Sequence, residues 1–162
     1  MTPNWLDPFF RSRRVAVLAI PRGERSPLTS PVWYNYDGAH FYVQVEASSA
    51  KAKAIARTGT AAVSLTIQSE VPPYRYAVVH GHATLRANDQ PGLRRQLARR
   101  YFGRLVGDMY VAEEEKKGVD ERKLQLIEIT PERTVSHDFG PEAGITGRIY
   151  FAIYRWLRPV PA

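Results

Sequence analysis

Short β-type runs separated by turn signals fill the sequence from Arg14 to Leu85, and they restrict the fold more than any other feature. The runs are rich in β-branched and aromatic residues, and glycine, proline and asparagine separate them, as in strands joined by tight turns. We read five strands in this part of the chain, over residues 15–20, 28–34, 40–45, 61–67 and 76–85. Several short strands at this spacing predict an antiparallel barrel that is closed or partly closed.

Local signals refine this prediction at three places. Pro27 and Pro31 each remove a backbone donor, so the strand over residues 28–34 should lie at an edge or at a bulge. The segment 35–38 is a strong hairpin signal, because its glycine readily adopts a positive φ. Gly81 lies inside a predicted strand, and it indicates a bulge or a close approach by another segment.

Helical patterns replace the strand pattern after Leu85. The first helix should begin at Asn88 or Asp89 and carry an apolar stripe made of Leu93, Leu97 and Tyr101. Roughly opposite the stripe, the helical period places three arginines that we interpret as a solvated outer face: Arg94, Arg95 and Arg99. A second helix is predicted over residues 105–117.

The segment 123–130 alternates between apolar and polar residues, which predicts a last long strand of the barrel. Pro131 to Arg133 should then turn the chain into a final segment over residues 134–139. The sequence therefore predicts a mainly β protein with helices, of the α+β class, built on a six-stranded antiparallel barrel. We assign this domain to residues 1–140 and an aromatic, basic and helical tail to residues 141–162.

Composition limits both the chemistry and the cellular context. A chain of 162 residues fits one domain. Cysteine is absent, which excludes disulfides, thiolate catalysis and zinc–thiolate sites. The first residues lack the order of a signal peptide, and no apolar run approaches the roughly 20 residues that span a bilayer. We therefore expect a soluble cytoplasmic protein.

The chain is strongly basic, with a net charge of +7 and a pI near 9.9. Such a charge favours a negative partner, and nucleic acid, an anionic membrane surface and a phosphorylated cofactor all qualify. The arginines are scattered instead of forming blocks, which argues against a dedicated nucleic-acid tail.

The segment from Ser49 to Arg57 looks like the start of a helix whose charges oppose the helix dipole. Ser49 is a good N-cap and strong helix formers follow it. Lys51 and Lys53 would then lie in or near the first turn, where each cation costs on the order of 0.3–1 kcal/mol. A serine cap, free backbone N–H groups and two lysines are suited to bind a phosphate. A solvated helix with incidental lysines is the alternative.

The order of these motifs resembles the pyridoxamine 5′-phosphate oxidase-like split β-barrels, a family that includes flavin and deazaflavin oxidoreductases. The resemblance covers about residues 5–139 and leaves out the tail. It rests on the order and spacing of four segments: V-A-V-L-A-I at 15–20, S-P-V-W-Y-N-Y-D-G at 30–38, S-S-A-K-A-K-A-I-A-R at 48–57, and Y-R-Y-A-V-V-H-G-H-A at 74–83. It implies a six-stranded antiparallel split β-barrel of the FMN-binding type.

The resemblance also implies a homodimer that holds its cofactor at the subunit interface. Ser49 and Lys51 would hold the phosphate, with Lys53 close by, and the ring system would lie against the second and third strands. The partner subunit would contribute from residues 74–76. The residues expected at the cofactor are Ser30, Pro31, Val32, Trp33, Val43, Gln44, Val45, Ser49, Lys51, Lys53 and Tyr76.

One departure from the family pattern concerns the choice of cofactor. Flavin-binding members often have Ser-Arg-Lys at this helix start, so that an arginine joins the phosphate clamp. Here Ala50 takes the place of that arginine. Members that use coenzyme F420 often lack the arginine, and the anionic tail of that coenzyme suits a basic surface. FMN is therefore the first expectation and F420 a close alternative.

The chain offers few side chains for acid–base chemistry. Hydride transfer to or from a flavin needs positioning more than a catalytic acid or base, so we assign no catalytic residues. His80 and His82 share one face of a strand, but no third ligand is near in sequence. We interpret them as ordinary strand histidines instead of ligands of a metal or haem. For His137 and Asp138 a strand-end hydrogen bond is favoured over contact with a substrate.

Three aromatic or basic features have both a structural and a functional interpretation. Trp33 and Tyr34 either stack on a cofactor ring or belong to the core. The basic segment 94–104 is favoured as a solvated face over a nucleic-acid site. The tail segment 147–158 is favoured as packing on the barrel or across a dimer over lying on a membrane. We therefore expect neither nucleic acid nor a membrane as the partner.

The leading hypothesis is an FMN-binding oxidoreductase that transfers hydride between the flavin and a small organic substrate. A coenzyme F420-dependent reductase on the same fold is the close variant. A non-catalytic module that holds a flavin, haem or another ligand is a hypothesis of a different class. A nucleic-acid-binding barrel is a weaker one.

Overall fold

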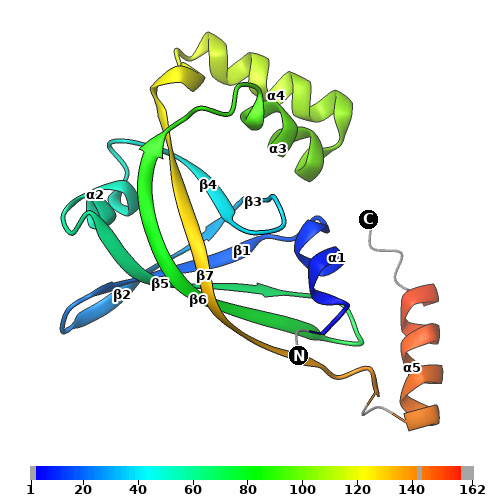
Figure 1. The fold of residues 1–162 in the computed structure, drawn as a ribbon. Helices are drawn as coiled ribbons and strands as arrows, with labels where there is room; N and C mark the ends of the chain where they lie inside the picture. Colours follow the sequence, from blue (N-terminus) through cyan, green and yellow to red (C-terminus); the bar gives the residue numbers. More distant parts are fainter. Residues whose placement is uncertain (1–2, 142–143, 158–162) are drawn as a thin grey trace.

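The computed structural model describes residues 3–141 and 144–157. Within them, an antiparallel sheet of seven strands curves around the core in the order β2-β1-β5-β6-β7-β4-β3 (Figure 1). The strands are β1 (Ala16–Arg22), β2 (Arg25–Val32), β3 (Asn35–Tyr36), β4 (Phe41–Glu46), β5 (Thr60–Gln68), β6 (Arg75–Ala87) and β7 (Leu124–Asp138). The mainly β, split-barrel class is confirmed. The strand number is seven instead of six because the two residues of β3 pair with β4, and the sheet is not closed.

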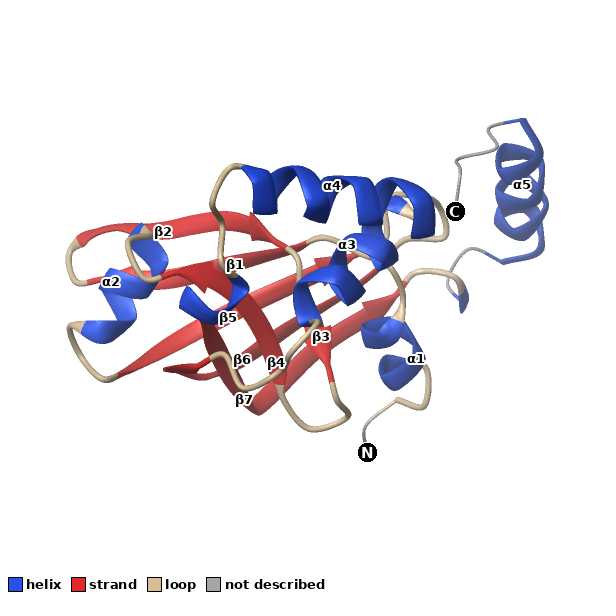
Figure 2. Cartoon of the chain, turned by 90° about the horizontal axis from the view of Figure 1, so that it is seen from above, coloured by secondary structure: helices blue, strands red, loops and turns tan. Residues whose placement is uncertain are grey.

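Four of the five helices in the described residues lie against the ends and the open side of the sheet, and the fifth, α5 (Gly144–Leu157), does not (Figures 1 and 2). The four are α1 (Leu6–Arg11), α2 (Ala50–Ala56), α3 (Leu93–Phe102) and α4 (Arg104–Lys116), with a short 3₁₀ turn, η1 (Glu121–Lys123). The helices α3 and α4 pack side by side as a hairpin, and α5 stands apart from the sheet in both views.

The helix α3 begins later than predicted. Its N-cap is Gly92, whose positive φ of 79° ends the preceding loop. The residues expected to cap the helix have other partners. The Asn88 amide donates to the backbone carbonyl of Glu121 at 3.1 Å, and Asp89 pairs with Arg86. These contacts keep residues 88–91 outside the helix.

The predicted turn at Pro131 is wrong, because β7 continues through it to Asp138. The register between β6 and β7 shifts at this point, with His80 opposite Arg133 and Gly81 opposite Pro131. The bulge accommodates a proline that cannot donate to the sheet. A Cβ at Gly81 would overlap the backbone carbonyl oxygen of Thr130. The close approach predicted from this glycine is therefore confirmed.

The core lies inside the curve of the sheet. Alternate strand residues such as Leu18, Leu65 and Val79 are fully buried there, as the strand period requires. Ile55 of α2 is buried against them as well. Tyr34 is also buried, and its hydroxyl donates to the backbone carbonyl of Phe10 at 2.9 Å. The core interpretation therefore holds for this tyrosine.

A mostly apolar row, interrupted by one threonine, crosses the outer face of the sheet. The register aligns Pro31 with Val17, Val17 with Thr66, Thr66 with Val78, and Val78 with Val135. Cross-strand neighbours project from the same face, so these side chains form one continuous row. Val17 is 43% exposed and Val135 is 39% exposed, although they lie in the middle of the sheet. We call this set the outer row.

The tail helix α5 also carries exposed apolar side chains. Ile145 is 80% exposed and Trp156 is 81% exposed. Packing of the tail across a dimer stays a prediction. Among the described residues, no helix combines the length and the apolar character needed to cross a membrane.

Candidate functional site

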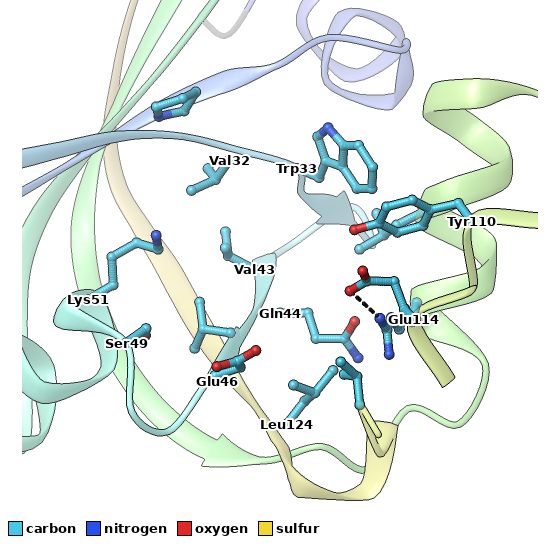
Figure 3. A pocket seen from close by; sticks show the side chains of 15 residues that line it. Val32, Trp33, Val43, Gln44, Glu46, Ser49, Lys51, Tyr110, Glu114 and Leu124 are labelled. Atoms are coloured by element: carbon cyan, nitrogen blue, oxygen red, sulfur yellow. Dashed lines mark hydrogen bonds and ion pairs between the residues drawn. The ribbon is translucent and has the colours of Figure 1, made fainter. Parts of the chain in front are cut away.

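A pocket of about 340 Å³ lies where the sheet is split, between the end of β2 and the outer edge of β4 (Figure 3). Residues from β2, β4, α2, α3, α4 and the start of β7 line it. They are Pro31, Val32, Trp33, Val43, Gln44, Val45, Glu46, Ser49, Lys51, Arg94, Leu97, Tyr110, Glu114, Val119 and Leu124. Its volume falls within the usual range for small-molecule sites.

The sheet topology explains the position of the pocket. The strand β2 is one edge of the sheet, and β3 pairs with β4 only at Phe41 and Tyr42. Residues 43–46 therefore have a sheet neighbour on one side only within the described residues, namely β7. Apolar side chains from both strands, Val32 and Val43 among them, form a wall between the two edges.

One end of the pocket is cationic. Ser49 caps α2, and its hydroxyl accepts from the backbone N–H of Ala52 at 3.2 Å. Lys51 follows in the first turn, is half-buried and lines the pocket. Across the described parts of the chain, no carboxylate lies within ion-pairing distance of its ammonium group.

Lys53 does not share this position. The helix α2 has only 7 residues, so Lys53 lies in its last turn, where a cation is favoured by the helix dipole. The prediction that both lysines oppose the dipole is therefore wrong for Lys53. Its side chain is exposed and is not part of the pocket lining.

The other end of the pocket is built by α3, α4 and η1. The Arg94 Nη2 donates to Glu114 Oε2 at 3.0 Å, the ion pair drawn as a dashed line in Figure 3. The Arg94 backbone N–H donates to Glu121 Oε1 at 3.0 Å, and the Gln44 amide donates to the same oxygen at 3.4 Å. This network joins β4, both helices of the hairpin and η1.

Arg94 corrects the prediction of a solvated arginine face. Only 8% of this residue is exposed, because α4 packs over it and supplies Glu114. Arg99 is exposed but donates through Nε and Nη2 to the two carboxylate oxygens of Asp108, at 2.7 and 2.9 Å. These hydrogen bonds hold the pKa of Asp108 below its ordinary value of 3.8. The arginines of α3 thus tie the hairpin together.

Aromatic rings close the pocket beside Trp33. The rings of Phe102 and Tyr110 meet Trp33 edge-on, with centroids 4.9 and 5.8 Å away. Tyr101 packs on the same ring, and burial raises the pKa of its phenol above the ordinary value of 10.0. The phenol hydroxyl donates to the backbone carbonyl of Arg14 at 2.6 Å. Trp33 lines the pocket and packs against the hairpin at once.

Eight of the eleven residues expected at a cofactor lie together in this pocket: Pro31, Val32, Trp33, Val43, Gln44, Val45, Ser49 and Lys51. Three do not. They are Lys53, described above, Ser30 and Tyr76. Ser30 pairs with Leu18 across β1 and β2, and Tyr76 pairs with His137 across β6 and β7. The parity of β6 puts Tyr76 on the same outer face as Val78.

Sequence reasoning missed the half of the pocket that the hairpin supplies. The lining residues that the sequence analysis does not predict are Glu46, Arg94, Leu97, Tyr110, Glu114, Val119 and Leu124. The only usable signal was the three-residue spacing of Arg94 and Leu97, which places them on neighbouring helix positions. That spacing does not indicate which other element the helix covers.

The histidines have local partners. His80 Nδ1 lies 3.0 Å from Ser64 Oγ, and His82 Nδ1 lies 2.7 Å from Glu132 Oε1. The described residues hold no group of three or more side chains placed to bind a metal ion. Asp138 accepts from the Gly140 backbone N–H at 2.9 Å, which confirms the strand-end hydrogen bond.

Comparison with solved structures shows the same fold in other proteins. A conserved hypothetical protein from Mycobacterium tuberculosis matches with a TM-score of 0.63 and 21% identity, over 85% of each chain. A protein named F420 reductase matches with a TM-score of 0.65 and 19% identity, over 83% of this chain and 98% of that one. An FAD-binding protein from Mesorhizobium loti matches with a TM-score of 0.58 and 15% identity, over 84% and 94%.

Comparison with sequences identifies the family. No curated protein matches the chain. The sequence profile of the pyridoxamine 5′-phosphate oxidase family matches residues 5–135. This range includes β1 to β6, β7 as far as Val135, and every residue that lines the pocket. The chain belongs to the pyridoxamine 5′-phosphate oxidase family.

Proposed function

We propose that the protein is a homodimeric, FMN-binding oxidoreductase that exchanges hydride between the flavin and a small organic substrate in the cytoplasm. The observation that carries the proposal is one pocket that has, at one end, a lysine without an ion-pair partner among the described residues and, in the middle, an apolar wall. A flavin phosphate needs the first and a planar ring system needs the second.

The residues present fit such a cofactor. The Lys51 ammonium would pair with the phosphate, and the Ser49 hydroxyl lies beside it on the same helix start. Val32, Val43 and Val45 present flat apolar surface for a ring. When bound, the flavin supplies the hydride chemistry. The chain's own contribution is to bind and orient the ring and to exclude water from it.

The outer row supports the homodimer. Pro31 belongs both to this row and to the pocket lining, so a second copy packed on the row would also reach the pocket. Tyr76 lies on the same outer face. A partner subunit could therefore bring its Tyr76 region to this pocket, which a single chain does not do.

Coenzyme F420 is the second candidate cofactor. Ala50 takes the place of the arginine that often joins the phosphate clamp of flavin-binding relatives. A protein named F420 reductase shares the fold over 83% of this chain. Both observations favour the deazaflavin enough to test the two cofactors side by side.

The absorbance spectrum of the purified protein tests the proposal first, because a bound flavin shows one near-ultraviolet and one blue absorption band, whereas the deazaflavin shows a single band between them. Titration with FMN and F420 should then give a dissociation constant below roughly 100 μM for one of them. Failure of both titrations would refute the cofactor assignment.

A second measurement tests the oxidoreductase part. The bound cofactor is reduced anaerobically and mixed with a panel of small organic acceptors. Reoxidation faster than in a protein-free control supports catalysis. Tight cofactor binding without any such acceleration would instead indicate a non-catalytic module that binds the cofactor.

A further inference from the structure

One guanidinium nitrogen of Arg94, a residue that lines the pocket, lacks a hydrogen-bond acceptor among the described residues. Its Nη2 is bound to Glu114, and its backbone N–H is bound to Glu121. Its Nη1 is buried and has no hydrogen-bond partner among the described residues. A buried donor without an acceptor is costly, and most proteins supply one. Arg94 therefore needs an acceptor that the described residues do not provide.

The charges around Arg94 determine what kind of acceptor fits. The Glu114 carboxylate neutralises the guanidinium, and Lys117 Nζ lies 3.8 Å from the other oxygen of Glu114. Glu121 adds a further negative charge beside the Arg94 backbone. The four groups sum to no net charge. The site therefore calls for an acceptor oxygen and offers no excess of positive charge for an anion.

The neighbouring lining gives the shape of the ligand. Arg94 shares the pocket with the rings of Trp33 and Tyr110, and Leu97 and Val119 are also part of the lining. Lys51 belongs to the other end, where the proposed cofactor phosphate would bind. A planar, largely apolar molecule with one polar oxygen matches the end near Arg94.

We propose that Arg94 is a substrate-binding residue whose Nη1 donates to an uncharged carbonyl oxygen of a planar molecule. This proposal rests on the proposed function in one respect only: the Lys51 end of the pocket is assigned to the cofactor. Because Nη1 is covered, the ligand oxygen reaches it when the guanidinium turns toward the pocket about its contact with Glu114. The turn gives Nη1 the partner it lacks.

Binding of simple probes to the full chain, without added cofactor, tests the proposal. Benzamide carries an uncharged carbonyl oxygen, toluene carries none, and benzoate carries a charged one. Ligand-observed NMR titration should find benzamide bound about tenfold more tightly than toluene, the scale expected for a hydrogen bond to a charged donor. In a Lys51→Gln background, which removes the cation at the other end of the pocket, benzoate should bind no better than benzamide.

The Arg94→Lys variant isolates the role of Nη1. Its ammonium can still pair with Glu114, but the second guanidinium nitrogen is gone. The preference for benzamide over toluene should fall to less than about twofold. The matched control is Arg95→Lys on the next residue of α3, which is not part of the pocket lining and should keep the preference.

A second variant keeps the proposal testable if Arg94→Lys does not fold. Glu114→Gln retains an acceptor for Nη2 but leaves the guanidinium charge uncompensated. It should shift the preference toward benzoate by about tenfold. An unchanged ratio of benzoate to benzamide in this variant would overturn the charge argument. Benzamide affinity that is equal in wild type and Arg94→Lys would overturn the assignment of Nη1.

The outcome is separable from that of the cofactor proposal. If neither FMN nor F420 binds but benzamide binding depends on Arg94, the proposed function fails and the carbonyl site stands. If a cofactor binds and the benzamide preference is absent, the carbonyl site fails and the proposed function stands.

Discussion

Trp33 and Tyr101 stack face to face, with ring centroids 4.9 Å apart and planes 8° apart. Tyr101 lies near the end of α3, and its hydroxyl donates to the backbone carbonyl of Arg14 at 2.6 Å, just before β1. Trp33 follows β2 and lines the pocket. This stack therefore fixes the helical hairpin against the strand segment that forms the pocket wall.

Two substitutions at Tyr101 should separate its hydrogen bond from its stacking. Tyr101→Phe keeps the ring and loses the donor, so the free energy of unfolding should fall by about 1 kcal/mol. Tyr101→Ala also loses the ring packing and should cost roughly 3 kcal/mol. Urea unfolding of both variants measures the difference. Equal losses in the two variants would show that the stack contributes nothing.

Reversal of the charge at Lys51 should abolish cofactor binding. Lys51→Glu would place a carboxylate where the phosphate is proposed to lie, and because the half-buried side chain faces the pocket instead of the core, the fold should stay intact. Titration with FMN and F420, with circular dichroism as a check of folding, measures the effect. Lys53→Glu is the matched control, because Lys53 lies outside the pocket and its variant should bind normally. Unchanged affinity in Lys51→Glu would refute the phosphate assignment.

A charge in the outer row should separate the proposed dimer. Val135→Arg would place a guanidinium in the interface without a partner, and such a burial is expensive. Sedimentation velocity should show a dimer for the wild type and a monomer for the variant. Val106→Arg introduces the same charge on an exposed position of α4, and it should stay dimeric. A dimer that survives Val135→Arg would mean that another face forms the contact.

The Arg99–Asp108 pair predicts a pH-dependent part of the stability. The pKa of Asp108 lies below 3.8 in the folded chain, so the carboxylate binds its proton less readily than in the unfolded chain. The stabilisation is therefore present above the ordinary aspartate pKa and is lost as the pH falls through the lower, folded value.

Thermal melting of wild type and Asp108→Asn measures this contribution. The wild type should melt at the higher temperature at neutral pH, and the two curves should converge below pH 3.8. Salt should reduce the gap, because the pair is exposed. A gap that persists unchanged at acid pH would point to packing instead of charge.

Strand patterns in this chain were strong predictors because burial follows the period of the sheet. Leu18, Leu65 and Val79 lie in strands that the sequence predicts over residues 15–20, 61–67 and 76–85, and all three are fully buried. Gly81 likewise predicted a close approach by another segment, and in the structure the backbone of Thr130 lies against it. Pro131 misled because a proline can continue a strand when a bulge removes the need for its N–H.

The hairpin half of the pocket was not predictable for a different reason. A helical period indicates which residues share a face, but it does not tell which element covers that face. Arg94 was assigned to solvent because arginine is seldom buried alone, and its partner Glu114 comes from a different helix, 20 positions away. Only the packing of α3 on α4 brings the two together.

That packing depends on Gly107, which supports a last prediction. A Cβ at this position would lie 2.6 Å from the backbone carbon of Ala98 and from the backbone nitrogen of Arg99, so α3 and α4 can approach only because the side chain is absent. Helix propensity alone predicts that Gly107→Ala stabilises the chain by about 1 kcal/mol, whereas overpacking predicts a loss of about 1–3 kcal/mol. We expect the loss, because both neighbours are backbone atoms that cannot yield without separating the helices.

Urea unfolding gives the sign of the change in unfolding free energy, with Val106→Ala as an exposed control on the same helix. Since the pocket takes residues from both helices, the same variant should also weaken ligand binding, and a stabilised variant with normal binding would show that the hairpin adjusts freely.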